Sequence, residues 1–291
     1  SLHLQRASIS AQRLENGQWE VAGFTANQAE NSTLPHRIEL EDSTLRLQYG
    51  GQKQTLRQVA GFIDRADGNF SLSASLFAPQ EYRMQASGSY SGSHFEQIQT
   101  TLSGFLPDGQ PFTAAWQGNA DYTPGQSRLN TKEGRLSIQI PDWQLNIEGN
   151  TRNWQLTPDS AVLPETHIIF SNADPANSQP PADAVRHSGS GSINKVSYQN
   201  RTLEIGGFQI SGTAEYGRGS SGYSANGRLQ AGPGHFQIDS LYLSTRHNAA
   251  PGSMPYLSGQ WHGQAAGNGQ SWNAELQGSL DNNEGYQIGR A

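Results

Sequence analysis

The feature that most constrains the fold is an alternation of apolar and polar side chains, which is clearest between residues 134 and 156. A period of two places successive side chains on opposite faces of a β-strand. No stretch of similar length has the i, i+3, i+4 spacing of an amphipathic helix. We therefore predict an all-β protein whose strands are apolar on one face and polar on the other, as in many antiparallel sheets.

The same alternation recurs along the chain, interrupted by short turns. Residues 2–11 and 19–23 flank a turn at 15–17, which predicts a hairpin, and another alternating segment begins at Phe70. More than a dozen such segments are present. Only residues 94–102 are compatible with a turn or two of helix, so we expect few or no helices.

A short signature of apolar, polar, apolar, polar and glycine residues recurs within the alternation. Its glycines include Gly88, Gly118, Gly149, Gly227 and Gly278. Glycine weakens a strand. Its repetition at positions where apolar residues are expected therefore indicates places where the inward face has no room for a side chain, at a bend, at a bulge, or at a close approach of backbone or ligand. Simple tolerance of glycine is the alternative. The spacing of the units is irregular, so the pattern indicates irregular hairpins and not a strict repeat.

Composition argues against a deep globular core. Only 34% of the 291 residues are hydrophobic, and 33 are glycine. We therefore predict an elongated, curled antiparallel sheet, resembling a β-groove or an open barrel. The net charge is −6 and the 19 Lys and Arg residues are scattered, which argues against nucleic acid as a partner. The chain has no cysteine, which excludes disulfides and zinc–thiolate sites.

One compositional break divides the chain. Residues 171–184 are rich in proline and almost without apolar residues, which is typical of a linker or a long loop. We predict an N-terminal β-sheet region at 1–170 and a C-terminal region at 185–291 that continues the same sheet. A boundary between two separate domains at 171–184 is the alternative.

Motifs that carry chemistry are weak in this sequence. Residues 217–222 match the glycine-rich phosphate loop, but a strand-like segment follows where a helix is required. Residues 64–68 and 281–285 resemble calcium loops without the full ligand set. No HExxH or GxSxG motif is present. We therefore predict no enzyme activity, catalytic residue, metal or cofactor, although an acidic pair from distant strands in a glycan-active enzyme stays an alternative.

The tryptophans permit two interpretations. Trp116, Trp143, Trp154, Trp261 and Trp272 are in phase with the alternation, so the simplest expectation is that they anchor a thin core. Aromatic side chains displayed on a sheet also stack on sugars. A carbohydrate-binding or cell-surface adhesive β module that uses exposed Trp and Tyr is therefore the alternative function.

Several segments resemble the AsmA-like proteins of Gram-negative bacteria, a group that includes TamB-type and YhdP-type proteins. The similar segments are 38–49, 68–76 and 134–149, and residues 193–243 are similar to relatives of the YdgA type. The resemblance implies a periplasmic β-sheet curled into a groove that conducts lipid acyl chains between the inner and outer membranes. It also implies an inner-membrane anchor, absent from this chain, and phospholipid or other lipid and outer-membrane assembly proteins as partners in cell envelope biogenesis.

A lipid groove of this kind would act passively, by shielding acyl chains from water. The inward side chains that we expect to form the groove face are Leu136, Ile138, Ile140, Trp143, Leu145, Ile147, Phe208, Ile210, Leu241 and Leu243. Ordinary core packing is the alternative role for each of these positions.

Overall fold

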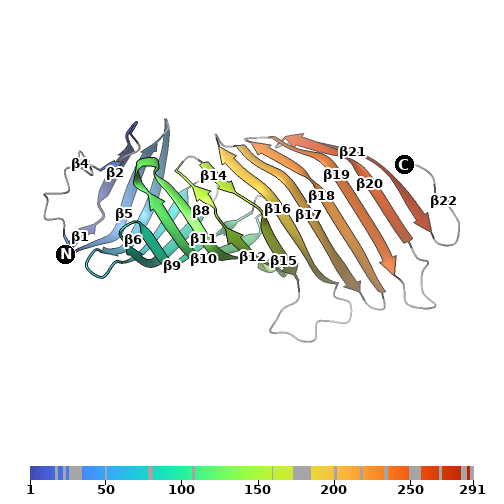
Figure 1. Ribbon diagram of the computed structural model, residues 1–291, viewed down its shortest axis with the longest axis horizontal. Helices are drawn as coiled ribbons and strands as arrows, with labels where there is room; N and C mark the ends of the chain where they lie inside the picture. Colours follow the sequence, from blue (N-terminus) through green and yellow to red (C-terminus); the bar gives the residue numbers. More distant parts are fainter. Residues whose placement is uncertain are drawn as a thin grey trace. The chain divides into compact units, whose positions relative to one another are not determined.

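The computed structural model shows an all-β protein. It describes residues 1–16, 19–21, 24–25, 35–49, 51–77, 81–106, 109–158, 160–172, 185–199, 202–216, 219–232, 235–248, 257–268, 271–282 and 287–288. These residues form 22 strands and two short 3-10 turns, with no α-helix among them. The prediction of a curled antiparallel sheet built from irregular hairpins is confirmed (Figure 1).

The chain divides into two compact units. The first contains Ser1–Asp142 and Thr151–Ser160, and the second contains Trp143–Asn150 and Ala161–Ala291. The units exchange short segments around β12 (Leu145–Arg152), so the division falls between residues 142 and 161. The proline-rich stretch lies almost wholly outside the described residues, which end at 172 and resume at 185.

The first unit is built mainly of long antiparallel hairpins. From β5 to β11, each strand pairs with the next in antiparallel orientation. The strands of this unit are β1 (Leu2–Gln5), β2 (Ser8–Arg13), β3 (Trp19–Val21), β4 (Phe24–Thr25), β5 (Arg37–Tyr49), β6 (Gln52–Asp64), β7 (Asn69–Phe77), β8 (Glu81–Ser91), β9 (His94–Phe105), β10 (Pro111–Thr123), β11 (Arg128–Ile140) and β13 (Gln155–Leu156).

Two pairings depart from the predicted antiparallel pattern. The hairpin between β2 and β3 forms as expected, with Ala11 opposite Val21. However, β1 and β2 both pair with β5 in parallel orientation. A parallel pair requires a crossover connection, and the chain between β2 and β5 contains two further short strands, so it is long enough to provide one.

The second unit is antiparallel at every register described. From β15 to β21, each strand pairs with the next, and β12 pairs with β15 (Figure 1). Its remaining strands are β14 (Ser160–Leu163), β15 (Thr166–Ser171), β16 (Arg186–Gln199), β17 (Thr202–Tyr216), β18 (Gly219–Gly232), β19 (His235–Asn248), β20 (Leu257–Asn268), β21 (Trp272–Asn282) and β22 (Gln287–Ile288).

Bulges interrupt the strands of both units. Gln58, Gln97 and Ser240 have positive φ angles of 51°, 50° and 53°. Each lies where the register with a neighbouring strand shifts by one residue. A bulge bends a strand and increases its twist, and it is one means by which a sheet curves. The bulges therefore give a physical account of the curvature of the strands.

The possible helix at 94–102 is wrong, because these residues belong to β9. The apparent helical spacing of Phe95 and Ile98 results from the bulge at Gln97, which brings residues three apart onto the same face. Both side chains belong to the same apolar cluster around Trp116.

The packed core of the first unit is small. Ile98, Trp116 and Ala120 are buried together, and Phe95, Leu129, Leu136 and Trp154 pack against them. The indole Nε1 of Trp116 donates a 2.8 Å hydrogen bond to Thr151 Oγ1, and the Trp116 and Trp154 rings stack at 6.3 Å. Trp116 is thus a buried anchor, as expected. Trp143 is not, because it lies in the 3-10 turn η3 (Pro141–Trp143) and is 50% exposed.

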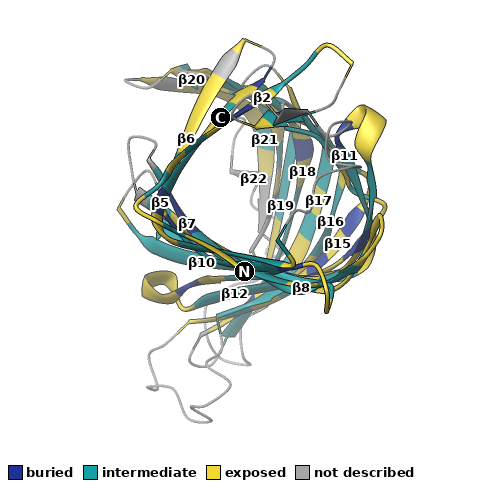
Figure 2. Cartoon of the chain, turned by 90° about the vertical axis from the view of Figure 1, so that its left-hand side faces the viewer, coloured by how far each residue is buried: buried dark blue, intermediate teal, exposed yellow. Residues whose placement is uncertain are grey.

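Little of either unit is deeply buried. Figure 2 shows buried residues as separate patches along the strands, not gathered in one core. Most of the described residues are half-buried or exposed, and the buried hydrophobic residues among them are scattered over both units. The sheet therefore leaves much of its surface in contact with solvent.

Asp64 shapes the turn between β6 and β7. Its Oδ1 accepts hydrogen bonds from the backbone N–H groups of Ala66 at 3.0 Å and Asp67 at 3.2 Å. Arg37 donates to Oδ2 at 3.3 Å. These backbone N–H groups, of which that of Asp67 contributes most, together with Arg37 hold the pKa of Asp64 below its ordinary value. The calcium-like sequence at 64–68 is thus explained by a turn closed by its own aspartate.

The Asp64 carboxylate is expected to make the fold sensitive to acid. Because its pKa is lowered in the folded state, it stabilises the protein above about pH 4, and this contribution is lost as the pH falls through the lowered pKa. We expect Asp64→Asn to reduce the melting temperature at pH 7 by a few degrees and to weaken its pH dependence below about pH 5. Thermal melts between pH 3 and pH 7 test this.

Asp67→Asn is the matched control, because Asp67 contributes its backbone N–H to the turn and the substitution retains that group. A melting curve for Asp64→Asn with the full acid sensitivity of the unmodified protein would refute this role of Asp64.

Candidate functional site

The candidate site is the apolar face of the second unit, which we define as the side chains that β12 and β15 to β21 direct to one side. A central row crosses every one of these strands, with each residue opposite the next in the register. In strand order from β12, this row is Gly149, Ile168, Gly191, Ile210, Ala225, Leu243, Trp261 and Gly278.

Further apolar residues continue the face along the strands. Phe208 lies opposite Ile193 and Gly227, and Leu241 lies opposite Gly263. Beyond these, a second row consists of Val196, Ile205, Leu229, Ile238, Ala265 and Ala274. The apolar face is therefore continuous in two directions, along the strands and across them.

Bulges keep this face continuous. Ile205 and Phe208 are three residues apart, as are Ile238 and Leu241, and a regular strand would point the members of each pair to opposite sides. The register shifts at these positions, so both members of each pair stay in the apolar rows. Without the bulges, half of each strand would present its polar side chains here.

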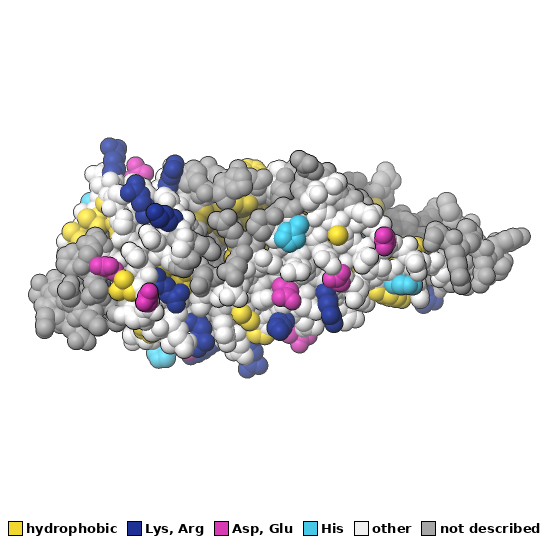
Figure 3. Space-filling model, turned by 90° about the horizontal axis from the view of Figure 1, so that it is seen from above, with side chains coloured by type: hydrophobic (Ala, Val, Ile, Leu, Met, Phe, Trp, Pro, Cys, Tyr) yellow, Lys and Arg dark blue, Asp and Glu magenta, His cyan; other side chains and the backbone are white. Residues whose placement is uncertain are grey.

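The apolar face of the second unit carries no acidic side chain, lysine or arginine among its described residues from β15 to β21. Charged residues of these strands, such as Glu204, Arg228 and Glu275, occupy the alternate positions and are exposed. Basic and acidic side chains are interspersed on the surface seen in Figure 3. The face is thus suited to an uncharged, apolar ligand surface.

Aromatic rings cover glycines on this face. Phe170, Gly189, Gly212 and Tyr223 lie opposite one another on four successive strands. The two rings lean toward each other across the glycines until their centroids are 6.5 Å apart. Three inter-strand steps of about 4.8 Å separate their backbones. The two rings therefore cover the backbone of Gly189 and Gly212.

The side chains of the face remain partly open to solvent. Ile168 and Ala214 are buried, at 8% exposure each. Phe208, Ile210, Leu241 and Leu243 are only half-buried, although their rows are continuous. Phe208 covers Gly227, and Trp261 covers Gly259 and Gly278, where an added Cβ would come within 3.1 Å of the ring. Rings of the sheet itself thus cover these glycines.

The structure places the predicted groove residues in three locations. On the apolar face of the second unit it brings together Leu145 and Ile147 of β12, Phe208 and Ile210 of β17, and Leu241 and Leu243 of β19. On β11 of the first unit, Leu136, Ile138 and Ile140 share one face. Trp143 lies in the turn η3 and on no strand, because Pro141 cannot donate a ladder hydrogen bond and the strand ends before it.

Sequence reasoning missed several residues of this face. Ile168 and Phe170 of β15 alternate with polar residues and could have been identified, but their strand is only six residues long. Gly189, which lies opposite Phe170, is not part of the recurring glycine signature, so no signal in the sequence identified it. The pairing of particular rings with particular glycines depends on the register and is visible only in the structure.

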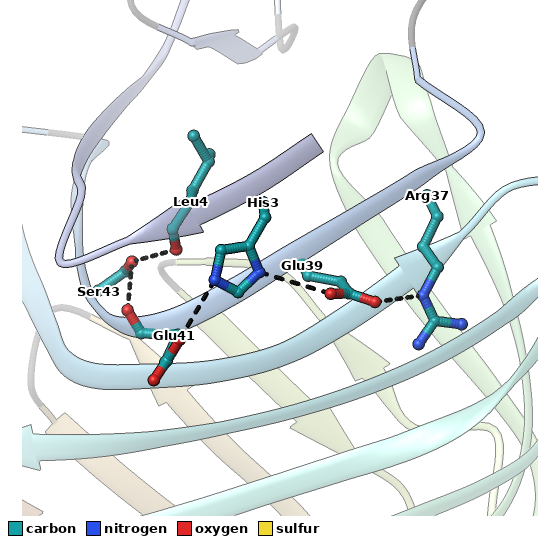
Figure 4. Close-up of polar contacts among 6 residues, drawn as sticks. All are labelled: His3, Leu4, Arg37, Glu39, Glu41 and Ser43. Carbon is teal, nitrogen blue, oxygen red and sulfur yellow. Dashed lines mark hydrogen bonds and ion pairs between the residues drawn. The ribbon is translucent and has the colours of Figure 1, made fainter. Parts of the chain in front are cut away.

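A second candidate is a polar cluster on the first unit, which Figure 4 shows. His3 lies between Glu39 and Glu41, with ring-to-carboxylate distances of 3.4 and 3.2 Å, and Arg37 donates to Glu39 at 2.7 Å. Arg37 and then His3 lower the pKa of the Glu39 carboxyl. Ser43 Oγ donates to the backbone oxygen of Leu4 or Glu41. These contacts hold β1 against β5, so we assign the cluster a structural role.

The described residues contain neither a metal-binding cluster nor a membrane-spanning helix. No group of three or more His, Asp or Glu side chains is arranged to hold a metal ion there. No helix in this part of the chain is sufficiently long and apolar to cross a membrane.

Comparison with known proteins gives no family assignment. No family model matches the chain, and no similar curated protein or solved structure was found. The resemblance to AsmA-like proteins therefore stays a prediction, and the function has to be argued from the fold and from the apolar face.

The ring-over-glycine packing predicts a specific sensitivity to an added methyl group. A Cβ at Gly212 would lie 2.6 Å from the backbone oxygen of Ser188 and 2.7 Å from the Tyr223 hydroxyl. We expect Gly212→Ala to lower the free energy of unfolding by about 1–3 kcal/mol, because the overpacked ring must move. Urea denaturation measures this change.

Gly207→Ala in the same strand is the control. An added Cβ there meets no atom within 4 Å. Its effect should be neutral or stabilising by at most about 1 kcal/mol. Equal destabilisation by the two substitutions would show that alanine is unfavourable in this strand for backbone reasons. It would contradict the explanation that the added Cβ at Gly212 clashes with the Tyr223 ring.

Proposed function

We propose that this protein binds lipid acyl chains along the apolar face of the second unit. The observation that carries the proposal is the continuity of that face, which crosses β12 and every strand from β15 to β21, and which has no acidic side chain, lysine or arginine among its described residues from β15 onward. Ordinary core packing would require a second layer to cover these rows, and their large side chains are instead mostly half-buried. A ligand with an apolar surface would complete the burial.

The driving force would be hydrophobic. Each methylene group removed from water contributes about 0.8 kcal/mol, so a chain of ten buried methylenes supplies on the order of 8 kcal/mol before the entropy of binding is subtracted. The side chains of the face are uncharged, and its backbone groups are already hydrogen-bonded within the sheet. Binding of an acyl chain would therefore not require any ionic group of the face to lose its hydration. The proposed role is passive and involves no bond-making residue.

We further propose that the protein acts in the periplasm of a Gram-negative envelope, anchored to the inner membrane by a segment outside this chain. The resemblance to AsmA-like proteins supports this location, and with it lipid transport toward the outer membrane and outer-membrane assembly proteins as partners. A curled sheet with an apolar concave face is the architecture that this resemblance implies.

The carbohydrate-binding alternative requires several exposed aromatic side chains on one surface. The exposed aromatics among the described residues are Phe105, Trp143 and Tyr198, which lie on β9, the turn η3 and β16. On the apolar face, Phe208, Tyr223 and Trp261 each lie over a glycine with one ring face already packed. Burial of an acyl chain accounts for this arrangement better than stacking of a sugar.

Lipid binding can be tested by native mass spectrometry of the purified protein, before and after incubation with phospholipid vesicles. We expect bound lipid, and we expect Leu243→Asp to reduce the bound fraction at least about tenfold, because a carboxylate in the central row would have to be desolvated by the acyl chain.

Ser244→Asp provides the matched control, because this neighbour on β19 points to the opposite face. It should retain lipid binding, and circular dichroism should show that both variants fold. A protein that neither carries lipid nor takes it up from vesicles would contradict the proposed function. Loss of binding in both variants would contradict the assignment of the apolar face.

A further inference from the structure

The first unit has a cavity of about 370 Å³ on the polar face of β2, β5 and β6. Six of the residues that line it form two short rows across these strands. One row is Ser10, Arg46 and Thr55, and the other, two positions away along the strands, is Gln12, Gln48 and Lys53. We call these six residues the donor array.

The floor of the cavity is the backbone between the two rows. Ala11, Leu47 and Gln54 occupy the intervening positions and lie opposite one another. Their side chains point to the other face of the sheet, because successive residues of a strand alternate. On that face Ala11 is buried, and Gln54 accepts a 2.8 Å hydrogen bond from the Tyr49 hydroxyl. The side chains of the donor array therefore surround the cavity on the polar face.

Every side chain of the donor array can donate a hydrogen bond. Its two hydroxyls and two amides are neutral donors, whereas the guanidinium of Arg46 and the ammonium of Lys53 are positively charged. Both cations are exposed and can be reached from solvent. Among the residues that the structure describes, neither has a carboxylate partner.

Arg46 and Lys53 are diagonal neighbours on adjacent strands. Diagonal neighbours in a sheet are about 7–8 Å apart, which is within reach of long side chains, and like charges at this separation repel each other. Several other cations of the first unit are instead paired with acids, and these pairs are Arg6 with Asp42, Arg37 with Glu39, and Lys132 with Asp121. Two neighbouring cations without such partners indicate a place for an anion.

Glu20 is the only acid among the described residues that line the cavity. It lies opposite Gln12 on β3, in the same row as Lys53. Three strand spacings, or about 14 Å along the sheet, separate the backbones of Glu20 and Lys53. The cavity is therefore positive over β5 and β6 and negative over β3.

We propose that the donor array binds the phosphate group of a phosphate monoester. Such a group carries roughly two negative charges at neutral pH and has three strong acceptor oxygens. The guanidinium and the ammonium match its charge, and the neutral donors around them match its oxygens. The cavity has the volume of a small ligand site, so the ligand is a soluble phosphate ester or the head group of a lipid. This inference rests on the first unit and is independent of the proposed lipid binding.

A titration of the isotope-labelled protein with glycerol phosphate, at constant ionic strength, tests this site by NMR. We expect the backbone amide signals of the donor array to shift as the ligand binds. Arg46→Gln and Lys53→Gln should each weaken the affinity on the order of fivefold, because each removes one charged contact at an exposed site. Glu20→Gln should strengthen binding, because it removes the acid from the cavity.

Arg135→Gln is the matched control. Arg135 is exposed on β11, does not line the cavity, and also has no carboxylate partner among the described residues. Its substitution makes the same change in net charge and should leave the affinity unchanged. Equal weakening by Arg135→Gln, or amide signals that glycerol phosphate does not shift, would overturn the inference. Sodium acetate that binds as tightly as glycerol phosphate would overturn the assignment to a phosphate group.

Vesicle sedimentation distinguishes the two sources of phosphate. The probes are vesicles of phosphatidylcholine and vesicles of an equal mixture of phosphatidylcholine and phosphatidic acid. A gain in binding from phosphatidic acid that Arg46→Gln abolishes and Arg135→Gln retains would assign the site to a lipid head group. A gain that neither variant changes, together with weaker glycerol phosphate binding by Arg46→Gln, would assign it to a soluble ester. Binding to phosphatidylcholine alone tests the proposed lipid binding, so the two proposals can fail separately.

Discussion

The structure depends on the packing of aromatic rings over glycines in neighbouring strands. A sheet whose apolar face is not sealed by a second layer has to exclude water with its own side chains. Phe170 and Tyr223 do so by leaning across Gly189 and Gly212, and in the first unit Trp116 lies over Gly118 and Gly134. Glycine weakens a strand, and the covering ring compensates by shielding its backbone. This packing explains how a chain with 34% hydrophobic residues can form so extensive a sheet.

The same packing determines what the apolar face of the second unit is able to bind. Rings that cover neighbouring glycines leave the aliphatic side chains between them partly exposed, within reach of a ligand. Charged residues stay on the opposite side because the bulges preserve the phase of each strand. An apolar surface without acidic side chains, lysine or arginine from β15 to β21 follows from the ring packing and the bulges, and it is the basis of the proposed lipid binding.

Much of the fold could be predicted from the sequence, because strand character depends on local alternation. The strands around Leu136 and Ile210 follow directly from a period of two. The bulges were the main obstacle. The sequence is compatible with a turn or two of helix at 94–102, where the bulge at Gln97 shifts the apolar phase of β9 by one residue. The parallel pairing of β1 with β5 was missed, because alternation indicates which residues form strands but does not indicate which strands pair with each other.

For the candidate site, the sequence by itself determined which side chains of each strand share a face, since the direction of a side chain in a strand is fixed by backbone geometry. It thereby identified Phe208, Ile210, Leu241 and Leu243 as members of one apolar surface. Only the tertiary structure decided which residues lie opposite one another, which ring covers which glycine, and that His187 and Tyr223 meet at one end of the face. These relations depend on the register between strands far apart in the chain, and hydrogen bonding and packing across the sheet set that register.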